Sequence, residues 1–223
     1  LPRPRAILVI SAHWLKAPAT LGTSTRRQLL YDFGGFDPAL RQVRYEAPAA
    51  SELADQLAKQ LPSLQRDDTR PWDHGVWVPL VHMVPTADVP VLQLSLPAAS
   101  KPEQLFELGR SLAPLREQDV LVLASGGAVH NLRALDWTGT SAPPAWATEF
   151  ETWLREGLRA HAVDELLAFR DRAPALRNAH PTDEHLLPLL VALGAAAPAQ
   201  SRVTFPIEGF EFGSLSRLAV RFG

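Results

Sequence analysis

Residues 6–13, with the sequence Ala-Ile-Leu-Val-Ile-Ser-Ala-His, decide the fold class of this chain. The first five are all apolar and several are β-branched, and such a short continuous run predicts a strand that is buried on both faces. Residues 89–96 and 120–125 have the same character. Segments with helical spacing of leucines separate these strands. The alternation predicts an α/β protein with a mostly parallel or mixed central sheet flanked by helices.

Two helix starts bear on the position of candidate site residues. Ser100 and Glu103 form the pattern of a capping box. Thr182 is expected to cap a helix that reaches Gly194, and this would place His185 in the first helical turn. The positive end of the helix dipole disfavours a charged imidazole there. We therefore expect His185 to be neutral and able to bind a metal.

The chain has 223 residues, a length that one domain can hold. No internal repeat or linker divides it, so we expect a single domain over residues 1–223. The sequence begins at Leu1 and its only methionine is Met83. We therefore expect a further segment to precede Leu1 in the full protein.

The composition excludes several classes of partner. The formal net charge is −2 and no basic patch stands out, so we expect no nucleic acid partner. No apolar run approaches the roughly 20 residues that span a bilayer, so we expect no membrane partner. The absence of cysteine excludes disulfides and thiolate ligands, and it fits a cytoplasmic protein.

Histidine is the most informative residue type, because neutral imidazole is the commonest metal ligand and the usual acid/base group near neutral pH. Of the seven histidines, His13 follows the first predicted strand and His130 follows the third. Ligands of open α/β sheets bind beyond the carboxyl ends of the strands, so both are candidate site residues. The alternatives are a core histidine at position 13 and a loop histidine at position 130 held by Asn131.

Two more histidines lie in particular contexts. His185 closes the segment His180-Pro181-Thr182-Asp183-Glu184-His185, and His74 lies in Trp72-Asp73-His74-Gly75. For His185 the alternative is a surface helix residue, and for His74 the adjacent aspartate is a weak indication by itself. Asp32 and Glu184 are the carboxylates nearest these motifs, and either could complete a metal site. His82 and His161 have no distinguishing context and are expected to be structural or solvated.

Taken in order, the short motifs resemble the class III extradiol ring-cleavage dioxygenases, in the branch of bacterial and plant DOPA 4,5-dioxygenase-like proteins. The resemblance covers nearly the whole chain. It depends on the following motifs: Ser11-Ala12-His13-Trp14, Asp32-Phe33-Gly34-Gly35-Phe36, Asp73-His74-Gly75 with Trp77-Val78-Pro79-Leu80, Gln93-Leu94-Ser95, Ser125-Gly126 with Val129-His130-Asn131-Leu132, and Pro181-Thr182 with Glu184-His185.

The resemblance implies a single catalytic α/β domain and a mononuclear metal held by three histidines. Two of them match His13 and His185, and the third is expected upstream of Leu1, with an N-terminal strand and loop. His130 would be the acid/base residue, and His74 would contact the substrate or dioxygen. Fe(II) is the expected working metal, and Zn(II) can occupy the same ligands without supporting redox chemistry. The implied partners are a catechol of the DOPA type and O2, and the implied assembly is a monomer or homodimer.

Two alternatives from other classes stay open at this point. A zinc hydrolase could use the same histidines, with Glu184 or His130 as the base. A non-catalytic binding protein could keep the fold without a metal. A DOPA-like substrate also has a carboxylate, and Arg26, Arg44 and Arg133 are candidates to bind it, with no spacing argument to select among them.

Overall fold

The structure of the chain is a computed structural model that describes residues 2–26, 28–97, 99–199 and 201–223. Within it the chain forms two compact units. Unit 1 comprises Leu1–Ser100 and Pro114–Ser125, and unit 2 comprises Lys101–Ala113 and Gly126–Gly223. Unit 1 contains the main sheet, and unit 2 contains most of the α-helices.

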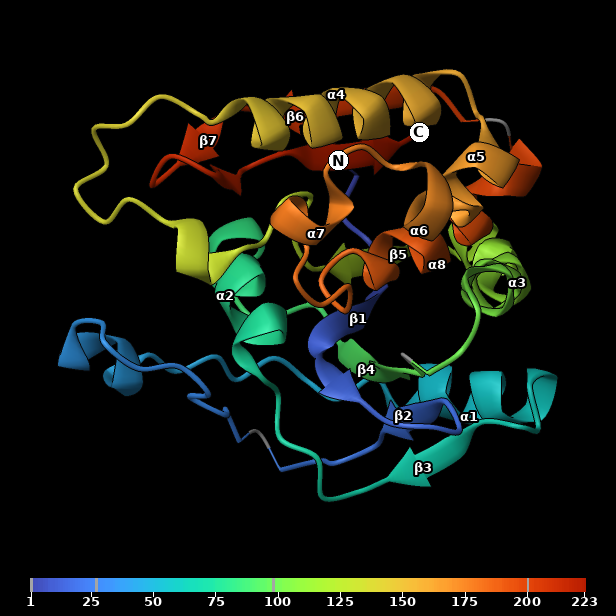
Figure 1. Cartoon of the computed structure of the whole chain (residues 1–223). Helices are drawn as coiled ribbons and strands as arrows, with labels where there is room; N and C mark the ends of the chain where they lie inside the picture. The colour runs from blue at the N-terminus through green and yellow to red at the C-terminus, as the bar shows by residue number, and fades with distance from the viewer. Residues whose placement is uncertain (1, 27, 98, 200) are drawn as a thin grey trace. The chain divides into compact units, whose positions relative to one another are not determined.

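Unit 1 is built on a five-stranded mixed sheet in the order β3-β2-β4-β1-β5 (Figure 1). The strands are β1 (Ala6–Leu15), β2 (Thr20–Gly22), β3 (Gln65–Asp67), β4 (Val91–Leu96) and β5 (Val120–Ser125). β1 lies between β4 and β5 and is parallel to both. β2 runs antiparallel to β4 and parallel to β3. The predicted α/β class with a mixed central sheet is confirmed, and the three strongest predicted strands lie side by side in it as β4, β1 and β5.

The parallel register brings three strand ends to one edge of the sheet. Ile10 pairs with Leu94 on β4 and with Ala124 on β5, and Ser11 is level with Ser125. Because parallel strands end at the same edge, the residues that follow them are neighbours in space. In unit 1 this edge therefore carries the end of β1, including His13.

Helix α2 (His74–Met83) covers one face of the sheet, while α1 (Ser51–Gln60) contacts β4. The side chains of β1 alternate between the faces, so Ile7 and Val9 lie together on one side. They form a buried apolar cluster with residues of α2 and its surroundings: Trp72, Val76, Trp77, Leu80, Val89 and Val91. A short 3-10 helix, η1 (Pro38–Gln42), follows β2 in the chain.

Unit 2 is mainly helical. Its helices are α3 (Pro102–Leu112), α4 (Ala145–Arg159), α5 (Val163–Leu167), α6 (Phe169–Arg172), α7 (Leu176–Ala179) and α8 (Leu187–Ala196), and the remaining 3-10 helices are η2 (Ala113–Gln118), η3 (Leu132–Ala134) and η4 (Ala197–Ala199). β6 (Val203–Ile207) pairs antiparallel with β9 (Ala219–Phe222), and β7 (Phe210–Glu211) pairs antiparallel with β8 (Leu215–Ser216). Helix α4 runs along the β6–β9 pair (Figure 1), where Arg155 and Arg159 stack on Phe205.

Two glycines allow α3 and α8 to pack closely. A Cβ atom added to Gly109 would run into the carbonyl oxygen of Val191, and one added to Gly194 would run into that of Phe106. Protein interiors leave no room for such overlap, so each glycine sits where one helix backbone touches the other. The contact fixes α8, and therefore the segment that leads into it.

Both predicted helix caps differ from the structure. Helix α3 has Lys101 at its N-cap rather than Ser100, and the backbone N–H of Lys101 donates to Gln104 Oε1 over 2.8 Å. Helix α8 begins only at Leu187, so Thr182 is not its cap. The prediction that His185 lies in a first helical turn is wrong.

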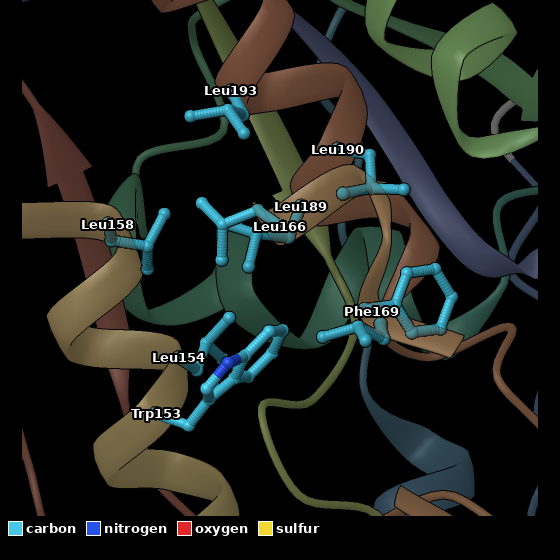
Figure 2. A pocket seen from close by; sticks show the side chains of 9 residues that line it. Trp153, Leu154, Leu158, Leu166, Phe169, Leu189, Leu190 and Leu193 are labelled. Atoms are coloured by element: carbon cyan, nitrogen blue, oxygen red, sulfur yellow. The ribbon is translucent and has the colours of Figure 1, made fainter. Parts of the chain in front are cut away.

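A leucine-rich pocket marks the core of unit 2. Figure 2 shows its lining side chains, which come from α4, α5, α6, α8 and the residue before α8: Trp153, Leu154, Leu158, Leu166, Phe169, Leu186, Leu189, Leu190 and Leu193. The cavity has about 10 Å³ of free interior. This is close to the space of a single water molecule, far less than a catechol ring needs. The pocket is therefore part of the packing of unit 2 and not a substrate site.

Among the residues that the structure describes, none of the helices has the length and apolar character that crossing a bilayer requires.

Candidate metal and acid–base site

Unit 1 brings two predicted site histidines together with a carboxylate. His13 lies near the end of β1, His74 is the first residue of α2, and Asp32 comes from the loop after β2. The rings of His13 and His74 have centroids 3.9 Å apart. Asp32 Oδ1 lies 2.8 Å from His74 Nδ1, and Asp32 Oδ2 lies 3.9 Å from His13 Nδ1. The end of a strand, the start of a helix and a loop therefore converge on one cluster.

Asp32 also caps α2, although it is distant from this helix in the sequence. Its Oδ1 accepts a hydrogen bond from the backbone N–H of His74 over 3.1 Å, in addition to the bond from the imidazole. The first N–H groups of a helix have no partner within the helix, so this bond satisfies one of them. Partial burial alone would raise the pKa of Asp32, but the hydrogen bonds from His74 outweigh it and hold the pKa below the ordinary 3.8. The carboxylate therefore stays ionised and holds the Nδ1 proton of His74.

The donor set of this cluster suits a divalent metal ion. One donor atom from each of His13, Asp32 and His74 can be chosen so that all lie within 4.8 Å of one another. Ligands bound at about 2.1 Å to one ion lie roughly 3–4 Å apart, so the residues would need to close in by only about 1 Å. Two imidazoles and one carboxylate are the donors typical of mononuclear non-haem iron centres. Of the two carboxylates that the sequence offered, Asp32 is the one in this cluster.

Unit 2 brings the other two predicted site histidines together. The rings of His130 and His185 are stacked, with centroids 3.5 Å apart and planes 9° apart. Glu184 Oε1 accepts a hydrogen bond from His185 Nδ1 over 2.9 Å. Burial alone would raise the pKa of Glu184, but its own backbone N–H, His185 and Thr182 outweigh burial and lower it. His185 Nδ1 is therefore held by Glu184, whereas the sequence analysis had expected a helix dipole to act on this ring.

Close backbone contacts fix this pair. A Cβ atom on Gly126 would run into the carbonyl oxygen of His185, and the same oxygen accepts a hydrogen bond from the N–H of Gly127 over 2.9 Å. The N–H of His130 donates to the carbonyl of Ala179 over 2.9 Å. The double glycine after β5 is thus required because the His185 segment lies directly against it.

The remaining histidines have structural or solvated positions. His180 is 3% exposed and its Nε2 donates to the carbonyl oxygen of Ala128 over 2.9 Å. His82 and His161 are exposed, in agreement with the prediction. Three of the seven histidines are therefore outside both clusters.

Aromatic side chains border the unit 1 cluster. The ring of Phe33 meets His74 edge to face at a centroid distance of 5.8 Å and Phe36 at 5.9 Å. Phe36 is 55% exposed. Arg44 uses Nη1 to donate to Tyr31 Oη and to nearby carbonyls, so it closes this loop and is no longer a strong candidate for a substrate carboxylate.

An α/β protein with imidazoles paired with carboxylates belongs to the class of proteins that can hold a catalytic metal. Comparison with known proteins identifies one family within that class. The family model described as the catalytic LigB subunit of aromatic ring-opening dioxygenase matches residues 1–223. The chain belongs to this family, and it is an extradiol ring-opening dioxygenase.

Individual relatives agree with this family. A 4,5-DOPA dioxygenase extradiol of Escherichia coli is 40% identical over 229 residues, covering 100% of this chain and 84% of the relative. One from Beta vulgaris is 39% identical over 199 residues, covering 87% of this chain and 74% of the relative. The crystal structure of an uncharacterized protein from Escherichia coli K12 has a TM-score of 0.85 at 38% identity and covers 100% of this chain and 88% of that one. Because the relatives are dioxygenases, a zinc hydrolase and a non-catalytic binding protein are disfavoured.

Proposed function

We propose that the chain uses Fe(II) to open the ring of a catechol of the DOPA type with O2. The observation that carries this proposal is the cluster of His13, Asp32 and His74 near the end of β1, which gathers donors of the kind that non-haem iron uses in a chain of this family. The substrate class is supported by relatives named 4,5-DOPA dioxygenase extradiol in bacteria and plants.

For the metal ligands we keep the assignment from the motifs. His13 and His185 would hold the ion, with a third histidine upstream of Leu1. Bound Fe(II) would supply open positions for the two catechol oxygens and for O2, and the redox step that a zinc ion cannot provide. The Nδ1 bond from His185 to Glu184 supports this role, because metal-binding histidines usually donate their other N–H to a carboxylate or a carbonyl.

His130 would move the proton. Its ring lies against His185, so a substrate beside His185 is within its reach. An imidazole near neutral pH can accept a proton from a catechol hydroxyl and return it when the O–O bond breaks. The backbone bond of His130 to Ala179 holds the residue in place during this exchange.

His74 would contact the substrate or dioxygen. Asp32 accepts the Nδ1 proton of His74, so Nε2 is the nitrogen left to face a ligand. Phe33 lies edge-on to the same imidazole and provides an apolar surface for an aromatic ring.

The metal assignment differs from the donor set seen in unit 1, in which His74 would itself be a ligand. His13 belongs to both ligand sets. The two sets differ in their second histidine, which is His185 in the proposed set and His74 in the set seen in unit 1. We expect His13→Ala and His185→Ala to lose bound Fe(II) by elemental analysis, and His74→Ala to keep it. Loss of iron from His74→Ala with retention in His185→Ala would replace the proposed ligands by His13, Asp32 and His74.

The function itself is tested by anaerobic loading with Fe(II), followed by O2 and a panel of catechols. We expect oxygen consumption in an oxygen electrode and a coloured ring-fission product from DOPA. Dopamine, which lacks the carboxylate, tests whether that group is recognised. Absence of oxygen uptake with every catechol by the iron-loaded full-length protein would overturn the proposal, and hydrolysis without oxygen uptake would favour the zinc hydrolase.

Four further predictions are kept as part of the proposal. The two units would act as one catalytic domain over residues 1–223. The protein would act in the cytoplasm, as a monomer or homodimer. Zn(II) would compete for the same ligands. The partners would be the substrate and O2, without nucleic acid or a membrane.

A further inference from the structure

A buried carboxylate lies directly beneath the unit 1 cluster. The side chain of Asp73 is 0% exposed. Its Oδ1 accepts a hydrogen bond from Ser11 Oγ over 2.6 Å, and its Oδ2 accepts bonds from Gln93 Nε2 over 2.5 Å and from Arg70 Nη2 over 3.0 Å. The three donors come from β1, from β4 and from the segment before α2. One carboxylate therefore ties together three parts of unit 1.

Two of these donors also hold the backbone of His13. Ser11 Oγ accepts a hydrogen bond from the N–H of His13 over 3.2 Å. Arg70 Nη2 donates to the carbonyl oxygen of His13 over 3.1 Å. Both polar backbone groups of His13 are thus bonded to side chains that Asp73 itself fixes.

The same residue sets the position of His74. Asp73 immediately precedes it, and the carbonyl oxygen of Asp73 accepts bonds from the N–H groups of Val76 and Trp77 to begin α2. A Cβ atom on Gly75 would run into Ser11 Oγ, so the first turn of the helix lies directly against the end of β1. A shift of Asp73 would therefore move both ring-bearing residues.

The side chain of Asp73 does not cap α2, although Asp73 is the N-cap residue of this helix. Aspartate at an N-cap normally accepts a bond from a backbone N–H of the first turn, and Asp73 makes no such bond. Asp32 accepts from the N–H of His74 in its place. A buried ion pair is weak evidence for stability, because apolar residues of the same size often stabilise a fold as well or better. The orientation of Asp73 is better explained by the placement of the two histidines.

We propose that Asp73 is a positioning residue that sets the separation of the His13 and His74 imidazoles. The inference rests on the proposed function to the extent that these two rings serve the metal and the substrate. It goes beyond that function, because Asp73 acts through Ser11, Arg70 and the start of α2.

Asp73→Asn is the direct test, because it keeps the size of the side chain and removes half of its acceptor capacity. The primary measurement is the imidazole 1H–15N spectrum of the metal-free full chain, with His13 and His74 assigned by single substitutions. We expect both signals to shift or broaden in Asp73→Asn, while those of the exposed His82 and His161 stay in place. The second measurement is the affinity for Co(II) alone, which we expect to fall about 10- to 100-fold, as for other groups that orient metal-binding residues.

Glu151→Gln is the matched control. Glu151 is also a buried carboxylate, it also accepts from a serine hydroxyl, Ser216 Oγ at 2.5 Å, and it also contacts an arginine, Arg155 at 3.5 Å. It belongs to unit 2, where its side chain is bonded to Ser216 and Arg155. We expect Glu151→Gln to lower thermal stability while leaving the His13 and His74 signals and the Co(II) affinity within about twofold of the unsubstituted chain.

Ser11→Ala provides a second variant if Asp73→Asn does not fold. It removes the link between Asp73 and the N–H of His13 but leaves the bonds from Gln93 and Arg70, so we expect the His13 signal to shift more than that of His74. Unchanged His13 and His74 signals in both variants would overturn the proposal. The spectra decide this role even if the unsubstituted chain binds no Co(II), a result that would count against the proposed metal function instead.

Discussion

His130 and His185 lie face to face in unit 2, with parallel rings whose centroids are 3.5 Å apart. Parallel imidazoles at this distance cannot both be charged without strong repulsion. Glu184 accepts a hydrogen bond from His185 Nδ1, so Nε2 is the nitrogen through which His185 would bind a metal. Under this assignment, His130 is the ring that would carry a proton during the reaction.

His130→Ala tests this division of roles. We expect turnover of catechol to fall by roughly 10²- to 10⁴-fold, the usual contribution of a general acid or base, while the iron content is unchanged. Elemental analysis beside steady-state rates measures both quantities. His82→Ala is the control, because His82 is exposed and lies outside both clusters. If His130→Ala loses its iron, His130 is a metal ligand and the roles of the two rings have to be exchanged.

Asp32→Asn tests the bond that joins the loop after β2 to the start of α2. The amide oxygen is an uncharged and weaker acceptor for the ring and backbone N–H groups of His74, and the amide NH2 replaces the oxygen that faces His13 Nδ1. Because charge-assisted bonds are weakened, we expect a loss of about 1 kcal/mol in the free energy of unfolding and a melting temperature lower by about 2–4 °C.

Asp37→Asn is the matched control in the same loop. Asp37 caps η1 through a 2.8 Å bond from the N–H of Ala39 and is exposed. We expect it to leave both stability and metal affinity nearly unchanged, because asparagine caps a helix about as well as aspartate, whereas Asp32→Asn lowers both. Equal metal affinity in the two variants would show that Asp32 is only a cap.

Gly75→Ala tests the close contact between α2 and the end of β1. The added methyl would overlap Ser11 Oγ, and it would lie 3.1 Å from Asp73 Oδ1 and 3.2 Å from His13 Cδ2. Ser11 cannot rotate away without breaking its 2.6 Å bond to Asp73. We expect a loss of about 1–3 kcal/mol, the usual cost of overpacking, measured by urea unfolding.

Gly34→Ala is the matched control, because it adds the same methyl group at a position with free space around it. No atom lies within 4 Å of the Cβ that would be added at Gly34. We expect its free energy of unfolding to stay within about 0.5 kcal/mol of the unsubstituted chain. If the two alanine variants unfold at the same urea concentration, the contact of Gly75 with Ser11 is not restrictive.

The sequence predicted the parts of the site that depend on local pattern. The apolar run before His13 is enough to define a buried strand, and the position of a strand end then follows from the parallel register. Gly126 is part of a motif in the sequence, but its tight contact with the carbonyl of His185 required the tertiary structure.

Contacts between segments that are far apart in the chain could not be predicted from the sequence. Asp32 lies in the loop after β2 and His74 begins α2 42 residues later, so nothing local indicates that the carboxylate caps α2. Helix α2 itself was not predicted, since it contains Pro79 and buries residues on several sides without one apolar stripe. The start of α8 was misplaced because Thr182 uses its hydroxyl to bond Glu184 over 3.1 Å instead of capping a helix. Side chains that can cap also bond locally, and the sequence alone does not decide which they do.

His180 gives the fold a dependence on pH. Burial lowers the pKa of His180 from the ordinary 6.5, and the nearby charge of His130 also lowers it. The bond to the carbonyl of Ala128 and the charges of Glu184 and Asp183 raise the pKa, but by less than burial lowers it. Its Nε2 donates to Ala128, and its Nδ1 is buried with no hydrogen-bond partner among the residues that the structure describes. A second proton on this ring would therefore lack an acceptor.

The unfolded chain binds a proton at His180 near pH 6.5, whereas the folded chain resists it to lower pH. The stability from a neutral His180 is thus fully present above about pH 6.5 and is lost as the pH falls through that value towards the lowered folded pKa. We expect the free energy of unfolding, measured by urea titration, to decrease between pH 7.5 and 5.5. His180→Gln, whose amide can donate in place of Nε2, should be less stable at pH 7.5 but should flatten this dependence. An equally steep decrease in His180→Gln would assign the effect to another group.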